Sequence, residues 1–372
     1  MIARFVLLYA AMYAAFGVAS PFLPAFLHSR GIGPEALGAV IALGTALRLV
    51  VAPLAGRFAD RRHALRLVLT ASACIATLIT AGYSWAGSAT LLAALYLAQS
   101  AALAPTAVLA DALAVGRGFE YGRVRGAGSA AFVAGTLVSG QAVGALGLEA
   151  IVWLQAVLLA LEALAASRVA ERPIAKVKTG LATRASVRRL LGLAPFRTLV
   201  LAAALILGSH AMNDAFAVVR WTAAGIDPAT SSLLWSEAVA AEVAVFFFLG
   251  PALLSVLTPG GAIALAAVAG VVRWAVMASS ASVAAAALVQ PLHGITFALL
   301  HLACMRLIAR TVPPGLEGTA QAIYGTVGIG AASAVLTLAA GMLYGRFGAA
   351  AFWAMAALCA LALPLAFRLA RA

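Results

Sequence analysis

Charged residues are scarce in this sequence: only 10% of its 372 residues are Asp, Glu, Lys or Arg, whereas 64% are hydrophobic. A soluble globular domain has about a quarter charged and about half apolar residues, so this composition excludes an ordinary soluble protein. Cysteine is also rare. Cys74, Cys304 and Cys359 stand singly in apolar runs, which excludes a disulfide framework and a C-x-x-C zinc site.

What the sequence does contain is a series of apolar runs of about 20 residues. The first four cover Phe5 to Leu27, Ala36 to Gly56, Leu65 to Trp85 and Ala89 to Val115, and the last covers Ala349 to Phe367. Each run can cross a hydrocarbon core of about 30 Å as an α-helix, and we count about twelve of them. We therefore predict an all-α membrane protein with twelve transmembrane helices. The first run is too long for the apolar part of a signal peptide, so we interpret it as the first span.

Basic residues are distributed unevenly between the linkers. One set of alternate linkers and the two termini hold twenty of the 25 Lys and Arg residues, while the opposite linkers hold Arg30, Arg220 and Arg346. By the positive-inside rule, we expect both termini and the central linker to be cytoplasmic. Topology thus explains most of the net charge of +13, and anionic lipid headgroups rather than nucleic acid are its expected partner.

The two halves of the sequence resemble each other weakly. A common offset of 194 positions superimposes Gly31-Ile32 on Gly225-Ile226 and Pro34 on Pro228. Gly and Pro are frequent, so single matches arise by chance, but the shared offset favours an internal duplication. Two parallel six-helix repeats with a substrate site near the midplane are typical of secondary transporters. We therefore predict a six-helix bundle, a basic cytoplasmic linker and a second six-helix bundle over residues 1–168, 169–196 and 197–372.

Several ionisable side chains lie inside the predicted spans, where each costs at least about 2.5 to 3.5 kcal/mol on insertion scales. The second half contains His210 and Asp214 on the seventh span, Glu242 on the eighth, Arg273 on the ninth, and His293 and His301 on the tenth. Histidine and buried glutamate suit proton transfer near neutral pH. We predict proton-coupling roles for all of these except His301, with Glu242 paired to Arg273. A purely structural role is the alternative. Pro291 and Gly294 also predict a kink beside His293.

The first half has fewer such residues. Arg48 lies midway along the second span, and Asp111 lies near the inner end of the fourth. An anionic substrate in a low-dielectric cavity needs a cation, which Arg48 or Arg273 can supply. The alternative for Arg48 is that its side chain extends to the membrane surface. Asp111 either takes part in conformational gating or pairs with Arg123 or Arg125. The remaining candidates for substrate binding are the aromatic residues Tyr13, Phe16, Trp235 and Phe297, together with His301, although aromatic side chains in membrane helices often only pack.

The inner end of the second span has the sequence "GRFADRR", Gly56 to Arg62. This stretch resembles the G-x-x-x-D-[RK] loop signature of the major facilitator superfamily, except that His63 stands where a glycine usually follows. The resemblance implies gating roles for Gly56, Asp60 and Arg61. Gly56 would permit close helix approach, and Asp60 would hold a helix end or an arginine. The alternative is that Asp60 only balances neighbouring arginines in a solvated loop.

Longer blocks resemble particular branches of this superfamily. "EYGRVRGAGSAAF" from Glu120 is similar to the start of the fifth helix in the lactose permease branch, with Arg123 and Arg125 as the matching pair, which implies gating roles for both. "LWSEAVAAEV", "GVVRW" and "LHGITFALLHLACMRLIA" resemble the phenylpropionate permease group. That resemblance implies proton-coupled uptake of an aromatic monocarboxylate through a bacterial cytoplasmic membrane. Thr296 stands where the lactose permease branch has a carboxylate, which disfavours a galactoside as substrate.

Other functions stay open at this point. They are a proton symporter of a sugar or a nucleoside, and an exporter of drug-like compounds. An intramembrane enzyme is disfavoured because the sequence contains neither H-E-x-x-H nor G-x-S-x-G. We expect a monomer that handles a small solute and protons, contacts membrane lipids and needs no cofactor or metal.

Overall fold

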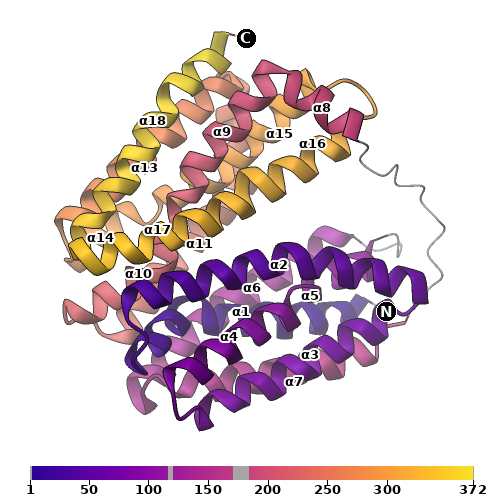
Figure 1. The fold of residues 1–372 in the computed structure, drawn as a ribbon, viewed down its shortest axis with the longest axis vertical. Helices are drawn as coiled ribbons and strands as arrows, with labels where there is room; N and C mark the ends of the chain where they lie inside the picture. The colour runs from indigo at the N-terminus through magenta and orange to yellow at the C-terminus, as the bar shows by residue number, and fades with distance from the viewer. Residues whose placement is uncertain (1, 116–119, 171–183, 372) are drawn as a thin grey trace. The chain divides into compact units, whose positions relative to one another are not determined.

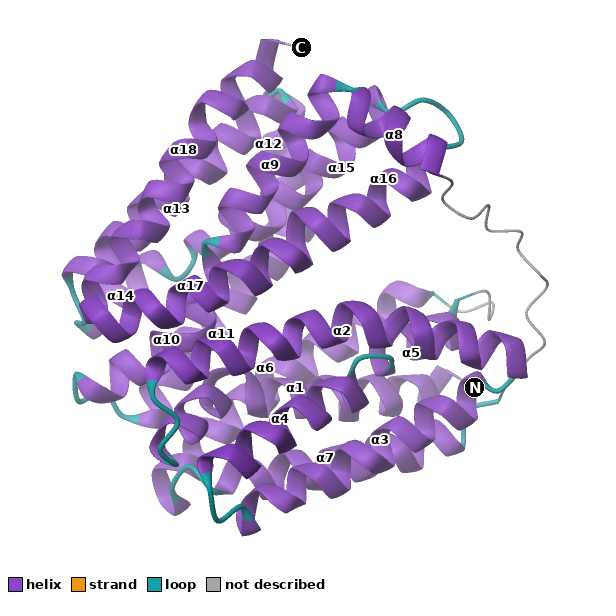
Figure 2. Ribbon diagram, viewed as in Figure 1, coloured by secondary structure: helices purple, strands orange, loops and turns teal. Residues whose placement is uncertain are grey.

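A computed structural model describes residues 2–115, 120–170 and 184–371. Figure 2 shows helices throughout these residues and no strand. The chain divides into two compact units. The first comprises residues 1–177 together with Trp221–Ser236, and the second comprises residues 178–220 and 237–372. Much of the predicted central linker, residues 171–183, lies outside the described residues, and the predicted boundaries at 168 and 197 stay predictions.

The first unit is built on the close packing of α1 against α6 and α7 (Figure 1). Gly17 makes this possible, because a Cβ there would collide with the carbonyl oxygen of Phe132 in α6. Small residues let membrane helices approach in this way. α4 and α5 together form one span, divided near Pro105, which lacks an N–H for the helical ladder. The helices of this unit are α1 (Ile2–Ser29), α2 (Pro34–Arg62), α3 (Leu65–Gly82), α4 (Ala89–Leu103), α5 (Thr106–Ala114), α6 (Tyr121–Leu146) and α7 (Ala150–Ser167).

The second unit packs α13 against α18, and α9 against α18 and α17. π-Helical stretches interrupt three of its spans, at Val245–Leu249, Gly294–Leu299 and Tyr324–Ala331. Such stretches insert an extra residue into a turn and often occur at functional sites. The helices that lie wholly or partly in this unit are α8 (Arg184–Gly192), α9 (Ala194–Gly208), α10 (His210–Ala223), α11 (Pro228–Ala244), α12 (Gly250–Val256), α13 (Pro259–Ser279), α14 (Val283–Val289), α15 (Leu300–Thr311), α16 (Glu317–Ile323), α17 (Ala332–Phe347) and α18 (Phe352–Arg371).

Eleven helical segments among the described residues are long and apolar enough to cross a membrane. The last of them, Glu317–Arg371, has 55 residues, which at about 1.5 Å per residue is more than twice the thickness of a hydrocarbon core. It turns at Gly348, whose φ of 54° lies in the left-handed region, so α17 and α18 are separate crossings. The predicted all-α membrane fold with about twelve spans is confirmed.

Large apolar side chains on the outside of the helices fit a lipid environment. Leu78, Leu146 and Leu288 are each more than 70% exposed. In water such a surface would be an aggregation hazard, whereas in a bilayer it is the normal contact with acyl chains.

Candidate functional site

The predicted proton-coupling residues of the second unit gather around Arg273. This residue lies in α13 and is completely buried. Its Nη1 donates a hydrogen bond to Nδ1 of His293 at 3.1 Å, and its Nη2 donates to Oε1 of Gln290 at 2.9 Å. The guanidinium carbon also lies 4.5 Å from the ring centroid of Trp274. Among the described residues no carboxylate forms an ion pair with Arg273, so polar and aromatic groups hold its charge.

Glu242 reaches Arg273 only through His293. Nε2 of His293 lies 3.3 Å from Oε2 of Glu242 in α11. Because a guanidinium has donors only, Nδ1 of His293 must accept, and the proton of the neutral ring then lies on Nε2, facing Glu242. The predicted pairing of Glu242 with Arg273 is therefore a relay of three side chains. Arg273 is its inaccessible end, while the side chains of His293 and Glu242 are 17% and 25% exposed.

The break in the tenth span positions His293 for this relay. α14 ends at Val289, and the span resumes as the π-helical stretch Gly294–Leu299, so the interruption predicted from Pro291 and Gly294 is present. A Cβ on Gly294 would lie 2.6 Å from the carbonyl oxygen of Ala241. Glycine at this position thus lets the tenth span touch the α11 backbone one residue before Glu242.

Aromatic and polar side chains surround the relay. The ring of Phe297 stacks on His293, with centroids 5.5 Å apart and an interplanar angle of 14°. His210, the first residue of α10, has its ring centroid 5.0 Å from that of His293. Asp214 is exposed one turn further along α10, and its Oδ1 lies 3.5 Å from Nδ2 of Asn213. His210 thus contacts the relay directly, whereas Asp214 lies outside its hydrogen bonds.

Two predicted substrate-binding residues are not part of the hydrogen-bonded relay. Nδ1 of His301 lies 3.2 Å from Oη of Tyr324, and the His301 ring contacts Phe246 edge-on. Trp235 is buried in the part of α11 that groups with the first unit. Neither residue is hydrogen-bonded to the relay.

The first unit holds a second polar cluster, around Asp111 in α5. Oδ1 of this residue accepts hydrogen bonds from Oη of Tyr9 at 2.5 Å and from Oη of Tyr121 at 2.6 Å. Nη1 of Arg125 lies 3.6 Å from the same oxygen and donates to Oη of Tyr13 at 2.5 Å. The predicted pairing of Asp111 with an arginine of the fifth span thus occurs with Arg125. It brings a cation beside tyrosines from α1.

Tyr13 and Phe16 extend this cluster into an aromatic wall. Their ring centroids are 5.8 Å apart in an edge-on arrangement, and the Arg125 guanidinium lies 5.4 Å from the Tyr13 centroid. Gly128 leaves room for the wall, because a Cβ there would lie 2.9 Å from Cδ2 of Tyr13. The side chains of Arg125 and Asp111 are 45% and 36% exposed, so this wall borders an accessible surface.

The other predicted residues of the first unit are less engaged. Arg48 is exposed and donates one long hydrogen bond, of 3.5 Å, to Oγ of Ser100. Arg123 is also exposed. Neither arginine forms an ion pair with another described residue.

The loop signature is part of a helix. α2 continues through Arg62, so the exposed residues Asp60 and Arg61 lie in its last turn. His63 caps this helix with φ 49° and ψ 44°, a left-handed conformation that explains why the superfamily usually has glycine here. A Cβ on Gly56 would meet no atom of the described chain within 4 Å, so the close helix approach predicted at Gly56 is absent from this structure.

Sequence reasoning assigned no role to four polar residues. Gln290 is hydrogen-bonded to Arg273, and Tyr9 and Tyr121 are hydrogen-bonded to Asp111. Each partner lies in another helix, so these contacts are visible only in the folded structure. Glu162 in α7 is completely buried, and neither of its carboxyl oxygens has a hydrogen-bond partner within residues 2–115, 120–170 and 184–371. Glu162 could have been recognised from the sequence, because it is a lone acidic residue in an apolar run.

Comparison with known proteins identifies the family and the fold. The family model described as "MFS_1 like family" matches residues 2–355. A probable 3-phenylpropionic acid transporter of Escherichia coli (strain K12) is 31% identical over 370 residues, covering 96% of this chain and 94% of the relative. A maltose permease of Geobacillus stearothermophilus is 26% identical over 360 residues, covering 95% and 91%. A crystal structure of a mutant of the nucleoside transporter NupG superimposes with a TM-score of 0.85 at 16% identity, covering 99% of this chain and 98% of that one.

The fold and these matches define a multi-pass membrane transporter of the major facilitator superfamily. Within that class, the chain belongs to the MFS_1 like family. It is therefore a transporter and not an enzyme, as the sequence predicted.

Proposed function

We propose that this transporter is a proton symporter that imports an aromatic monocarboxylate similar to 3-phenylpropionate by alternating access. The observation that carries this proposal is the relay of Arg273, His293 and Glu242 inside the spans of the second unit. A buried cation that is linked to an acid only through a histidine is costly in a bilayer unless it serves a function. The 31% identity to a probable 3-phenylpropionic acid transporter supports the choice of substrate.

The direction of hydrogen bonds in the relay selects the group that takes up the proton. Nδ1 of His293 already accepts from Arg273, so a second proton on this ring would place an N–H against the guanidinium. Glu242 is the more accessible end and takes the proton instead. Once Glu242 is neutral, Arg273 loses its counter-charge, and binding of a substrate anion becomes more favourable. His210 and Asp214, both in α10, contribute to the electrostatic potential at the relay.

The substrate needs a cation for its carboxylate and an apolar surface for its ring. The cluster of the first unit supplies both, with Arg125 for the carboxylate and the wall of Tyr13 and Phe16 for the ring. Arg48 is a second candidate cation because it forms no ion pair with another described residue. Gly56, Asp60, Arg61, Asp111 and Arg123 take part in gating in this proposal.

The remaining parts of the proposal concern the cell. The distribution of basic residues supports cytoplasmic termini, and the bacterial relatives support the cytoplasmic membrane. The protein acts as a monomer on a small solute and protons, and it requires no cofactor.

Uptake into proteoliposomes tests this function. Radiolabelled 3-phenylpropionate is supplied outside, with and without an inward proton gradient, in competition with 3-phenylpropionamide, maltose and uridine. We expect gradient-driven accumulation that unlabelled acid inhibits and the neutral amide does not. Arg125→Gln should weaken this inhibition, whereas Arg368→Gln, at an exposed position in the last turn of α18, serves as the matched control.

Two other outcomes would contradict the proposal. Inhibition by maltose or uridine alone would indicate a sugar or nucleoside symporter, for which the maltose permease relative is a precedent. Accumulation only in everted vesicles would indicate an exporter.

A further inference from the structure

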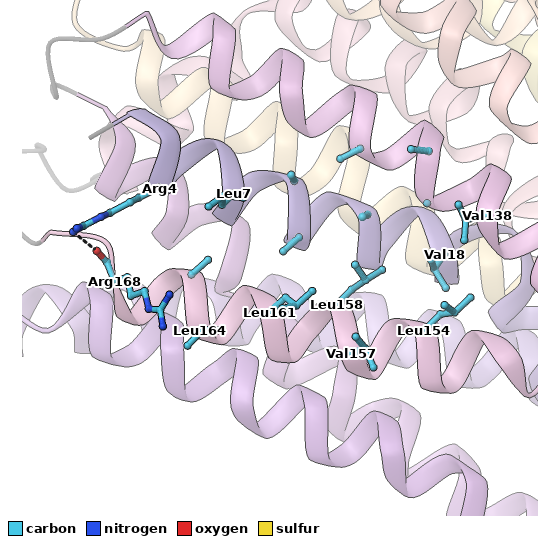
Figure 3. Close-up of a pocket in the computed structure, with 17 residues that line it drawn as sticks. Arg4, Leu7, Val18, Val138, Leu154, Val157, Leu158, Leu161, Leu164 and Arg168 are labelled. Carbon is cyan, nitrogen blue, oxygen red and sulfur yellow. Dashed lines mark hydrogen bonds between the residues drawn. The ribbon is translucent and has the colours of Figure 1, made fainter.

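An apolar groove runs along the outside of the first unit, between α1, α6 and α7 (Figure 3). Its volume is about 570 Å³. Leu7, Val138 and Leu161 line it and are 63%, 53% and 47% exposed, so the groove is open to the surroundings of the helices. In a membrane protein, an open apolar surface of this kind faces acyl chains.

The groove is as long as an acyl chain in one leaflet. Along α1 it extends from Arg4 to Val18, a rise of about 21 Å at about 1.5 Å per residue. One leaflet contributes roughly half of a hydrocarbon core of about 30 Å. A complete acyl chain therefore fits lengthwise between the three helices.

Two arginines close one end of this groove. Figure 3 shows Arg4 and Arg168 at the same end of the row of apolar side chains. Nη1 of Arg4 donates to the main-chain oxygen of Arg168 at 3.0 Å, which holds the Arg4 side chain against the backbone of Arg168. Both are exposed, and neither forms an ion pair with an acid in the described part of the chain. The distribution of basic residues places this end at the cytoplasmic surface, where anionic lipids are concentrated.

We propose that this groove binds one anionic phospholipid, with an acyl chain along α1, α6 and α7 and the phosphate of its headgroup between Arg4 and Arg168. The charge complementarity of the two arginines selects an anionic headgroup over a zwitterionic one. The bound lipid fills the space between the helices that form the core of the first unit. This site does not depend on which solute the protein transports.

Native mass spectrometry of the detergent-purified protein tests this site. The protein is titrated in parallel with dioleoylphosphatidylglycerol and with dioleoylphosphatidylcholine. We expect one phosphatidylglycerol to be retained at concentrations at which phosphatidylcholine is not. Arg4→Gln combined with Arg168→Gln should weaken retention roughly tenfold or more, because each arginine near an anionic headgroup contributes about fivefold in affinity. Arg368→Gln combined with Arg371→Gln, which removes the same charge from exposed positions in α18, should leave retention unchanged.

A second variant tests the acyl-chain part of the site separately. Ala134→Leu adds bulk at an exposed position that lines the groove and should weaken retention of phosphatidylglycerol without changing the charge. Leu78→Trp, at a 73% exposed position in α3 outside the groove, is its control. Equal retention of both lipids, equal losses in the Arg368/Arg371 control, or a lipid-free dimer that covers the groove would each overturn the proposal.

Discussion

Gln290→Glu is the substitution that most sharply probes the charge of Arg273. Oε1 of Gln290 lies 2.9 Å from Nη2 of Arg273, and both residues are completely buried. A glutamate at this position would place a carboxylate directly against the guanidinium. At an effective dielectric constant of about 20, two unit charges about 4 Å apart attract each other by about 4 kcal/mol, which is roughly a thousandfold bias toward the paired state.

This attraction should make the Gln290→Glu variant more stable but less active in transport. Because Arg273 already bears the cost of burial, we expect Gln290→Glu to raise the melting temperature of the detergent-purified protein. Arg273 would also stay neutralised whatever the protonation state of Glu242. Proton-driven uptake into proteoliposomes should therefore fall by at least about tenfold, since the roughly thousandfold bias opposes release of the guanidinium.

The same substitution at Gln99 is the matched control. Gln99 is 2% exposed, and its Nε2 donates to Oγ1 of Thr80 at 2.6 Å and to Oε1 of Gln155 at 3.2 Å. A glutamate cannot donate these bonds, and no arginine is hydrogen-bonded to Gln99 in the described chain, so Gln99→Glu should lower stability by about 1–3 kcal/mol for each donor lost. If Gln290→Glu destabilises the protein as much as Gln99→Glu does, Arg273 does not carry a charge that lacks a directly paired carboxylate.

Two further substitutions test other parts of the structure. Glu162→Leu removes a buried carboxyl group that has no partner among the described residues, so thermal unfolding should show a stabilisation of about 1–3 kcal/mol; a lower melting temperature would mean that the carboxyl is satisfied. Gly294→Ala places a Cβ 2.6 Å from the Ala241 carbonyl oxygen and should separate His293 from Glu242, abolishing proton-driven uptake. Gly325→Ala, in another π-helical stretch with open space around it, should transport normally, and equal activity of the two alanine variants would refute the role of close approach at Gly294.

Much of the fold follows from apolar length alone. The run predicted over Phe5 to Leu27 is the helix Ile2–Ser29, and Leu65 to Trp85 matches its predicted span. The second span is longer than predicted, because charged residues at its inner end continue the helix as far as Arg62. An apolar run marks only the part of a helix that lies within the membrane. Helical hydrogen bonding can continue beyond the membrane surface, where the residues are charged.

The candidate site was predictable only in part. The sequence identified Glu242, Arg273 and His293 because an ionisable group in an apolar run needs an explanation. It did not identify the order of the relay, since that depends on how far each helix is rotated about its own axis. These helices are apolar on most faces, so no polar face indicates that rotation. The contact of Tyr9 with Asp111, 102 positions apart in sequence, was hidden for the same reason.

The most direct test of the central claim is the movement of protons that accompanies the substrate. In weakly buffered, non-energised vesicles, addition of 3-phenylpropionate should make the external medium more alkaline as protons enter with the acid. Glu242→Gln should abolish this alkalinisation while exchange of labelled for unlabelled substrate continues, because the amide stays neutral in both directions of transport. Alkalinisation of normal size in Glu242→Gln would contradict the assignment of the transported proton to the relay.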